Sequence, residues 1–330
     1  MNCIQNNSRI SWIDIVKGIG ICLVVLGHVY RFNSVLIWIY SFHMPLFFAL
    51  SGGLRGCDRK IVDWIAFVKK KFISLIVPVI VFLPILFIYW LIVERHFREF
   101  DIGPIWFLPA LFFAEVVAEI IFNCSNKKVV RGIIPLVALL LYFCSLMIDS
   151  RTLLVWIPRC LGGFLFYLMG AAAADLVTVK TAIERVSRPT LLGIVVVFAA
   201  LSIVLSQLNG RVDLYSLIFG NFLLYLIAAI VGTLFVIQIS ILIRRCKPLE
   251  FLGRYSLIIL CTHEQVKRAF IQVCSIVTKS SAEEIRNHIL FGIGISVFVI
   301  LIEVVVVYVV VKIGQIFKNT KLKWLFSFIK

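Results

Sequence analysis

The stretch "RISWIDIVKGIGICLVVLGHVY", residues 9–30, decides the fold class of this chain. Its apolar part, which continues to residue 31, is long enough to cross a lipid bilayer, because a helix needs about 20 apolar residues to do so. No small-residue cleavage site follows it, so the pattern favours a helix that stays in the membrane over a removable signal peptide.

Nine further apolar runs follow. Hydrophobic residues make up 62% of the 330 residues, charged residues 15%, and the mean hydropathy is +1.05. A water-soluble protein is excluded, because a water-facing surface needs far more charge. We expect an all-α integral membrane protein in which residues 1–330 form a single bundle of about ten transmembrane helices, with no soluble domain. The predicted spans are 13–31, 35–54, 72–93, 104–122, 130–148, 154–174, 190–208, 215–243, 257–277 and 289–313.

The net charge of +16 follows the expected topology. With the N-terminus in the cytoplasm, 22 Lys and Arg residues fall on the inner side and seven in the outer loops. This asymmetry is the positive-inside signal, so we expect both termini in the cytoplasm and no nucleic-acid partner. The nine cysteines show no metal-binding spacing, and no metal site is expected.

The first predicted span carries a polar stripe formed by Asp14, Lys17 and His28. Eleven residues separate Lys17 from His28, which is three helical turns plus about 20° and a rise of about 16 Å. Such groups inside a membrane by default face the bundle interior or a cavity. The alternative is that Asp14 and Lys17 neutralise each other at the inner interface while His28 lies at the outer one.

A second histidine follows in "SFHMPLFFALSGG", residues 41–53. His43 comes soon after a short outer turn, so we expect the imidazoles of His28 and His43 at similar depth in neighbouring helices. Pro45 frees a backbone carbonyl, which is tolerated only beside protein or a wet cavity. Because histidine suits proton transfer near neutral pH, the pattern favours a polar chamber over two packing accidents.

Three adjacent lysines precede the third span in "FVKKKFISLIVP", residues 67–78. Lys69, Lys70 and Lys71 fit either a positive-inside anchor or a cradle for the phosphates of a donor such as coenzyme A. The segment 55–72 has apolar residues at helical spacing beside lysines, which predicts an amphipathic helix lying along the inner membrane surface.

Further ionisable residues lie within predicted spans, among them Glu115, Arg159 and His263. A structural ion pair explains Glu115 and Arg159 at least as well as catalysis does. His263 lies far enough from both membrane surfaces to need a partner, and its pattern supports a structural and a functional role equally.

The motifs quoted above, together with "PIWFLPALFFAE" and "FLGRYSLIILCTH", resemble the bacterial membrane acyltransferase family 3 in their order along the whole chain. This resemblance implies about ten transmembrane helices and transfer of an acyl group, commonly acetyl from acetyl-CoA, to a hydroxyl of a surface carbohydrate. It also implies that His28 is essential. Lys17 and Lys69–Lys71 stand where the family often has arginine, and lysine lacks the bidentate guanidinium.

Together these observations predict a multi-pass acyltransferase of the cell (inner or plasma) membrane. His28, His43 and Asp14 are the predicted catalytic residues. Lys17, Lys69, Lys70 and Lys71 are predicted to bind the donor acetyl-CoA, and Arg159, Glu115 and His263 the carbohydrate acceptor. The lipid bilayer and proteins of glycan assembly are the expected partners. A transporter or flippase for a lipid-linked sugar or small solute is the alternative, since many helices with intramembrane charges fit that class too.

Overall fold

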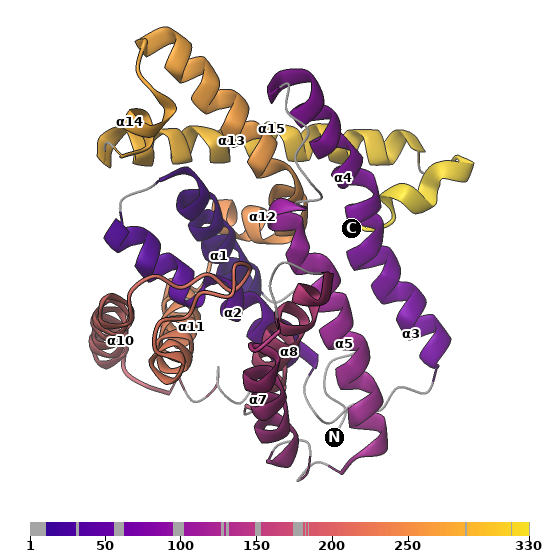
Figure 1. The fold of residues 1–330 in the computed structure, drawn as a ribbon, viewed down its shortest axis with the longest axis vertical. Coiled ribbons are helices and arrows are strands. Elements are labelled where there is room, and N and C mark those ends of the chain that lie inside the picture. The colour runs from indigo at the N-terminus through magenta and orange to yellow at the C-terminus, as the bar shows by residue number, and fades with distance from the viewer. Residues whose placement is uncertain are drawn as a thin grey trace.

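The computed structural model is all-helical over the residues that it describes, apart from one isolated β-bridge between Asp213 and Ile218. Figure 1 shows the helices gathered into one bundle. The described residues are 11–30, 33–55, 63–94, 102–126, 129, 132–148, 153–173, 181, 183, 185–287, 289–317 and 319–329.

Thirteen α-helices are described. In chain order they are α1 (Ser11–Val29), α2 (Asn33–Arg55), α3 (Trp64–Lys71), α4 (Val77–Tyr89), α5 (Phe107–Cys124), α7 (Ile133–Ser145), α8 (Trp156–Ala172), α10 (Arg188–Asn209), α11 (Phe222–Ile243), α12 (Lys247–Arg254), α13 (Ser256–Thr278), α14 (Ala282–Asn287) and α15 (Ile289–Phe317). Short π and 3₁₀ segments join some of them: η1 (Phe72–Ile76), η2 (Trp90–Glu94), η3 (Gly103–Trp106), η4 (Leu153–Val155) and η5 (Lys321–Phe326).

Each of the ten predicted spans coincides with a helix, and seven of the described helical segments are long and apolar enough to cross a membrane. The other three are α7 with 13 residues, α8 with 17, and α13, which has 23 residues but carries Glu264, Lys267 and Arg268. The all-helical membrane class is therefore confirmed. The total of ten spans and the cytoplasmic position of both termini stay predictions.

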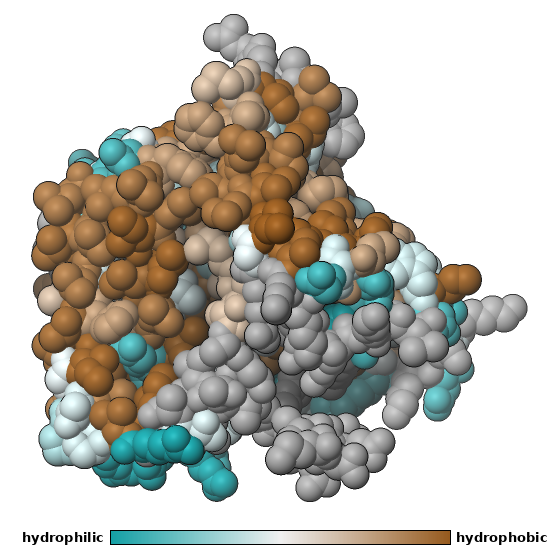
Figure 2. Space-filling model, turned by 90° about the horizontal axis from the view of Figure 1, so that it is seen from below, coloured by the Kyte–Doolittle hydropathy of each residue, from teal (hydrophilic) through white to brown (hydrophobic). Residues whose placement is uncertain are grey.

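The outer surface of the bundle is apolar, as contact with lipid requires. Leu136, Leu223, Ile276 and Val305 are each more than 60% exposed although they are large hydrophobic residues. Figure 2 shows apolar side chains over most of the coloured surface seen from below. An exposed apolar area of this extent is a lipid-facing surface, because soluble proteins rarely expose contiguous apolar patches of more than a few hundred Å².

The described part of the predicted amphipathic helix over 55–72 is helical from Trp64, and its placement along the inner membrane surface stays a prediction. From Trp64 onward, α3, η1 and α4 form one continuous helix that extends to Ile92, seen as a single slanting rod at one edge of Figure 1. Residues 56–62 lie outside the described part. The π turn η1 ends two residues before Pro78, whose missing N–H removes an α-helical hydrogen bond at this point.

The predicted span 215–243 begins too early. The helix α11 starts at Phe222, because residues 213–218 form a turn in which the Asp213 carboxylate accepts from the backbone N–H groups of Tyr215 and Ser216. The side chain of Asn221 then accepts from the N–H of Leu224 and caps α11. The hydrogen bonds that Asp213 accepts stabilise this turn, and a count of apolar residues cannot detect them.

The first helix lies at the centre of the bundle. It packs against α2, α11, α12, α13 and α15, and twelve of its 19 residues are buried. The neighbouring α2 packs tightly on α8 at Gly52, where a Cβ atom would lie 1.9 Å from the backbone oxygen of Tyr167. Gly52 therefore permits close helix contact, as small residues commonly do between membrane helices.

Candidate functional site

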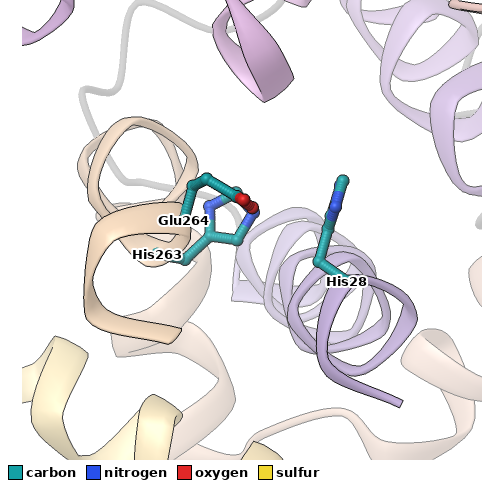
Figure 3. Close-up of side chains that lie close together, drawn as sticks. All are labelled: His28, His263 and Glu264. Atoms are coloured by element: carbon teal, nitrogen blue, oxygen red, sulfur yellow. The ribbon is translucent and has the colours of Figure 1, made fainter. Parts of the chain in front are cut away.

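A cluster of three polar side chains forms where α1 meets α13. The ligand-type atoms of His28, His263 and Glu264 all lie within 4.8 Å of one another, and the imidazole centroids of His28 and His263 are 5.1 Å apart. Figure 3 shows His28 projecting from α1 and the other two side chains facing it from α13. His263 is fully buried and Glu264 is 7% exposed.

The position of His28 follows from the end of α1. His28 belongs to the last turn of the helix, whose final carbonyls have no partner within the helix. Arg286 of α14 donates to the carbonyl oxygens of His28 at 2.7 Å and of Val29 at 2.8 Å. This guanidinium therefore holds the end of α1, and with it the His28 backbone, against the last third of the chain.

Hydrogen bonds to carbonyls fix the tautomers of two neutral histidines. Nδ1 of His263 lies 2.9 Å from the carbonyl oxygen of Ile259, and Nδ1 of His43 lies 2.9 Å from that of Ile39. A carbonyl oxygen can only accept, so Nδ1 carries the proton and Nε2 keeps its lone pair. Nε2 of His263 is buried with no hydrogen-bond partner among the described residues, so it can accept a proton from a neighbour or a bound ligand.

Two cations hold the carboxylate of Glu264. Lys267 donates to Oε2 at 2.6 Å and Arg268 to Oε1 at 2.5 Å, and Lys267 is itself 6% exposed. Two histidines and a glutamate also form a common zinc ligand set. Here both carboxylate oxygens already accept from cationic donors, which disfavours a metal ion at the same oxygens. The cluster therefore fits proton handling better than metal binding.

His43 and His28 both lie beside the ring of Tyr40. The ring of Tyr40 lies between them, with its centroid 6.2 Å from the His28 ring and 4.8 Å from the His43 ring. All three side chains line one cavity. The structure thus places both predicted histidines at the same chamber, and the imidazole of His263 packs beside that of His28.

Three adjoining cavities follow α1 from one end to the other. The Lys17 cavity has a volume of about 280 Å³ and is lined by Lys17 and Ile21 of α1. The central cavity, of about 190 Å³, is lined by Val24 and His28. The arginine cavity, of about 960 Å³, is lined by Gly27 and His28 of α1 and by three arginines from other parts of the chain. Because these residues succeed one another along one helix, the cavities form a row with His28 where the second meets the third.

Shared side chains connect the row. Met44 and Leu260 line both the Lys17 cavity and the central cavity. His28, Tyr40 and Glu264 line both the central cavity and the arginine cavity. The three cavities are therefore adjacent, and His28 and Glu264 of the cluster border both the central cavity and the arginine cavity.

The Lys17 cavity brings together residues that were predicted to bind different substrates. It is lined by Lys17, predicted to bind the donor, and by Glu115, predicted to bind the acceptor. Lys71 donates to Oε1 of Glu115 at 2.8 Å, whereas Lys69 and Lys70 are exposed on α3. Oε2 of Glu115 is buried without a hydrogen-bond partner among the described residues. The three lysines thus separate into one that forms an ion pair with the bundle and two that face outward.

Asp14 is not brought to the histidines. Fourteen residues separate it from His28 on the same helix, which corresponds to about 21 Å. Asp14 is buried in the contact between α1 and α12, where a Cβ atom on Gly253 would lie 1.8 Å from its backbone oxygen. Its place favours a role in this helix contact over the predicted catalytic one.

Arg159 lies behind the wall of the central cavity. Its Nε donates to the backbone oxygen of Tyr215 at 2.8 Å, and its guanidinium carbon lies 3.8 Å from the centre of the Tyr215 ring. Tyr215 lines the central cavity, and Arg159 is not among the lining residues of the three cavities. These contacts support the turn at 213–218, and the predicted contact of Arg159 with the substrate stays a prediction.

Sequence reasoning missed Glu264 and Tyr40 as members of the site. The signal for Glu264 was present in "THEQVKR", residues 262–268, where an acidic residue precedes a lysine and an arginine by three and four positions inside an apolar helix. Such spacing places the three charges on one helix face. Tyr40 gave no signal, because aromatic residues are common in the spans.

The curated relative matched by the chain is Nodulation protein NolL of Sinorhizobium fredii, which is 30% identical over 159 residues. The alignment covers 41% of this chain and 43% of that protein, so the chain spans less than half the length of the relative. No solved structure matches. The family model of the acyltransferase domain matches residues 10–310, nearly the whole chain. The protein therefore belongs to this acyltransferase family, whose motifs the sequence resembled.

Proposed function

We propose that the protein is a membrane O-acyltransferase that transfers an acetyl group from acetyl-CoA to a hydroxyl of a cell-surface or lipid-linked carbohydrate. One observation carries this proposal: the cluster of His28, His263 and Glu264 lies where cavities from both ends of α1 meet. Two substrates of different size and polarity can therefore reach one proton acceptor from opposite sides.

In the proposed reaction His28 is the general base. The acceptor hydroxyl attacks the thioester carbonyl carbon and its proton passes to the imidazole of His28. The carbon–sulfur bond then breaks, and the departing thiolate takes that proton, which leaves an ester and free coenzyme A. Such assistance contributes about 10²–10⁴-fold to a rate.

His263 and Glu264 assist His28 in this scheme. The bare Nε2 of His263 faces the cluster and can accept the N–H of the His28 ring, which leaves the other ring nitrogen of His28 for the substrate. Glu264 stabilises the imidazolium that forms, because opposite charges attract strongly in a site with little water. His43, across Tyr40, lines the chamber and binds the reacting groups.

The donor enters from the Lys17 cavity. Its acyl-pantetheine arm occupies this narrow and largely apolar space, with Lys17 and Glu115 beside it. The phosphates remain outside the bundle and meet Lys69 and Lys70, which are exposed at the start of the third span. Lysine serves phosphate as a point charge.

The acceptor enters from the arginine cavity, which has room for one or two sugar rings at about 960 Å³. With the expected topology this cavity opens on the outer side of the cell (inner or plasma) membrane, where surface glycans are assembled. Proteins of that assembly would deliver the acceptor.

A transporter is the second function that the sequence leaves open. A row of cavities through the bundle fits a transport path as well, but membership of an acyltransferase family favours acyl transfer. Saturable binding of radiolabelled acetyl-CoA by the purified protein would favour the enzyme; no binding would favour the transporter.

The decisive test measures acyl transfer by the purified full chain with radiolabelled acetyl-CoA and membrane glycan from a strain lacking the gene. We expect His28→Gln to lower kcat by about 10²–10⁴-fold with little change in acetyl-CoA binding. Cys22→Ala is the matched control, because Cys22 lies on the same helix and lines none of the three cavities. A fully active His28→Gln protein would remove His28 from the reaction.

A further inference from the structure

The arginine cavity holds more positive charge than the topology explains. The charged residues lining it are four basic and two acidic side chains: Arg211, Lys267, Arg268, Arg286, Asp213 and Glu264. The positive-inside rule leaves few cations for this end of the bundle, since only eleven of the 33 Lys and Arg residues fall outside the expected inner segments. Four of those eleven gather at one cavity, so their position needs a local cause.

The two carboxylates do not balance this charge. Asp213 accepts from the backbone of its own turn and from the hydroxyl of Ser216 at 2.7 Å. Glu264 accepts from both Lys267 and Arg268, so one negative charge faces two positive ones. The described lining therefore keeps a positive surplus in a part of the molecule that is bordered by apolar helices.

The cations are also held in place before any ligand binds. Arg286 is anchored by its two bonds to the carbonyl oxygens of His28 and Val29. These two carbonyl oxygens orient the guanidinium toward the end of α1. Lys267 is 6% exposed and Arg268 is half-buried, so both are fixed by packing as well. Preorganised cations bind an anion at a lower cost in side-chain ordering.

The remaining polar lining suits a sugar ring. Tyr40, Tyr89, Asn33, Gln272 and Ser275 supply hydroxyl and amide groups around the same space. Such groups exchange hydrogen bonds with ring hydroxyls, whereas guanidinium groups prefer the planar pair of oxygens of a carboxylate or phosphate. The cavity thus combines the donors for a neutral sugar with those for an oxyanion.

We propose that the acceptor is an acidic carbohydrate, whose carboxylate or phosphate is bound by the cations of the arginine cavity while a hydroxyl of the sugar reaches His28. This inference rests on the proposed function and specifies its acceptor. Arg211, exposed at the cavity, and Arg286, beside the end of α1, contribute the charge that selects such acceptors over neutral ones.

Binding of simple sugars to the full chain in detergent tests this without any acyl transfer. The probes are methyl glucoside, methyl glucuronide and glucose 1-phosphate, measured by ligand-detected NMR titration at low salt. We expect at least one acidic sugar to bind about tenfold more tightly than methyl glucoside, the equivalent of about 1.4 kcal/mol. A preference for methyl glucuronide would identify a carboxylate as the anionic group of the acceptor, and a preference for glucose 1-phosphate would identify a phosphate. Added salt should reduce the preference.

Two variants test whether the charge of the arginine cavity causes the preference for acidic sugars. Arg211→Gln should reduce the preference for the acidic sugar by about three- to tenfold, since it removes one charge from the lining. Lys279→Gln is the matched control. Lys279 is an exposed cation in the loop between α13 and α14, and it does not line the cavity. It should leave the preference unchanged.

Several results would overturn the inference. These are equal binding of neutral and acidic sugars, no binding of either acidic sugar, or a preference that survives in Arg211→Gln. Displacement of the acidic sugar by coenzyme A would also overturn it, because this cavity would then belong to the donor. A protein that keeps the preference but transfers no acyl group would instead refute the proposed function and leave the acidic ligand standing.

Discussion

The two ends of the cavity row differ in almost every property that matters for a ligand. The arginine cavity has about 960 Å³ and charged walls, whereas the Lys17 cavity has about 280 Å³ and walls rich in leucine, phenylalanine and isoleucine. A wide polar space can receive a hydrated sugar, while a narrow apolar one accepts a slender chain and excludes water. The same histidine cluster can therefore meet a polar and an apolar partner without one substrate entering the other's cavity.

The strongest test of this difference fills one cavity at a time. Leu111→Trp places an indole in the Lys17 cavity, where Leu111 is 6% exposed. We expect kcat/KM for acetyl-CoA to fall by about 100-fold, because even a 1 Å displacement of a reacting group can cost that much. Binding of the sugar probes should not change.

The reciprocal variant is Ala282→Trp, which narrows the arginine cavity from α14. It should weaken sugar binding and leave acetyl-CoA binding as it was. If either variant impaired both substrates equally, the two cavities would not be separate entrances.

A smaller effect is expected when the charge of the cluster is removed. Glu264→Gln keeps the shape of the side chain but loses its charge-assisted bonds to Lys267 and Arg268. Such bonds contribute about 1.5–3 kcal/mol, so a kcat about 10- to 100-fold lower is expected if Glu264 stabilises the imidazolium. Thermal unfolding should be measured beside kcat. A lower melting temperature with normal kcat would leave Glu264 a purely structural residue.

The lysines before the third span offer the next comparison. Replacing the exposed Lys69 and Lys70 by Gln should weaken acetyl-CoA binding about three- to tenfold in a salt-sensitive manner, as expected for phosphate contacts in water. Lys71→Gln should mainly lower thermal stability, because Lys71 is the partner of the buried Glu115. Equal behaviour of all three lysines would contradict this division.

The smallest expected effect concerns the Lys17 end of α1, where Ser11 donates to Oε1 of Glu250 at 2.5 Å. This bond lowers the pKa of Glu250, so its stabilisation is present above the unfolded-state pKa and is lost as the pH falls through the folded-state pKa. Ser11→Ala should therefore lower the melting temperature slightly at neutral pH and not in acid. A loss that persists in acid would assign the effect of Ser11 to its bond with the Arg244 carbonyl.

The sequence predicted the helices well because each span depends mainly on its own apolar residues. It also predicted that His28 and His43 share a chamber, since a short turn joins their helices. It could not predict that His263 lies beside His28, because 235 positions separate them and only the packing of α13 on α1 brings them together. The same limit explains Arg159, whose partner Tyr215 lies in a turn that was expected to be helical.

The continuous helix that begins at Trp64 is longer than a bilayer is thick. Its 29 residues, Trp64–Ile92, correspond to about 43 Å of helix, against about 30 Å of hydrocarbon. Unless the helix tilts steeply, about 13 Å of it stands in water, and this is the end that carries Lys69 and Lys70. The phosphates of the acyl-CoA donor would then bind in the aqueous phase, before the donor contacts lipid. The thickness of the host membrane would set the distance between these phosphates and the His28 cluster that the rest of the donor must span.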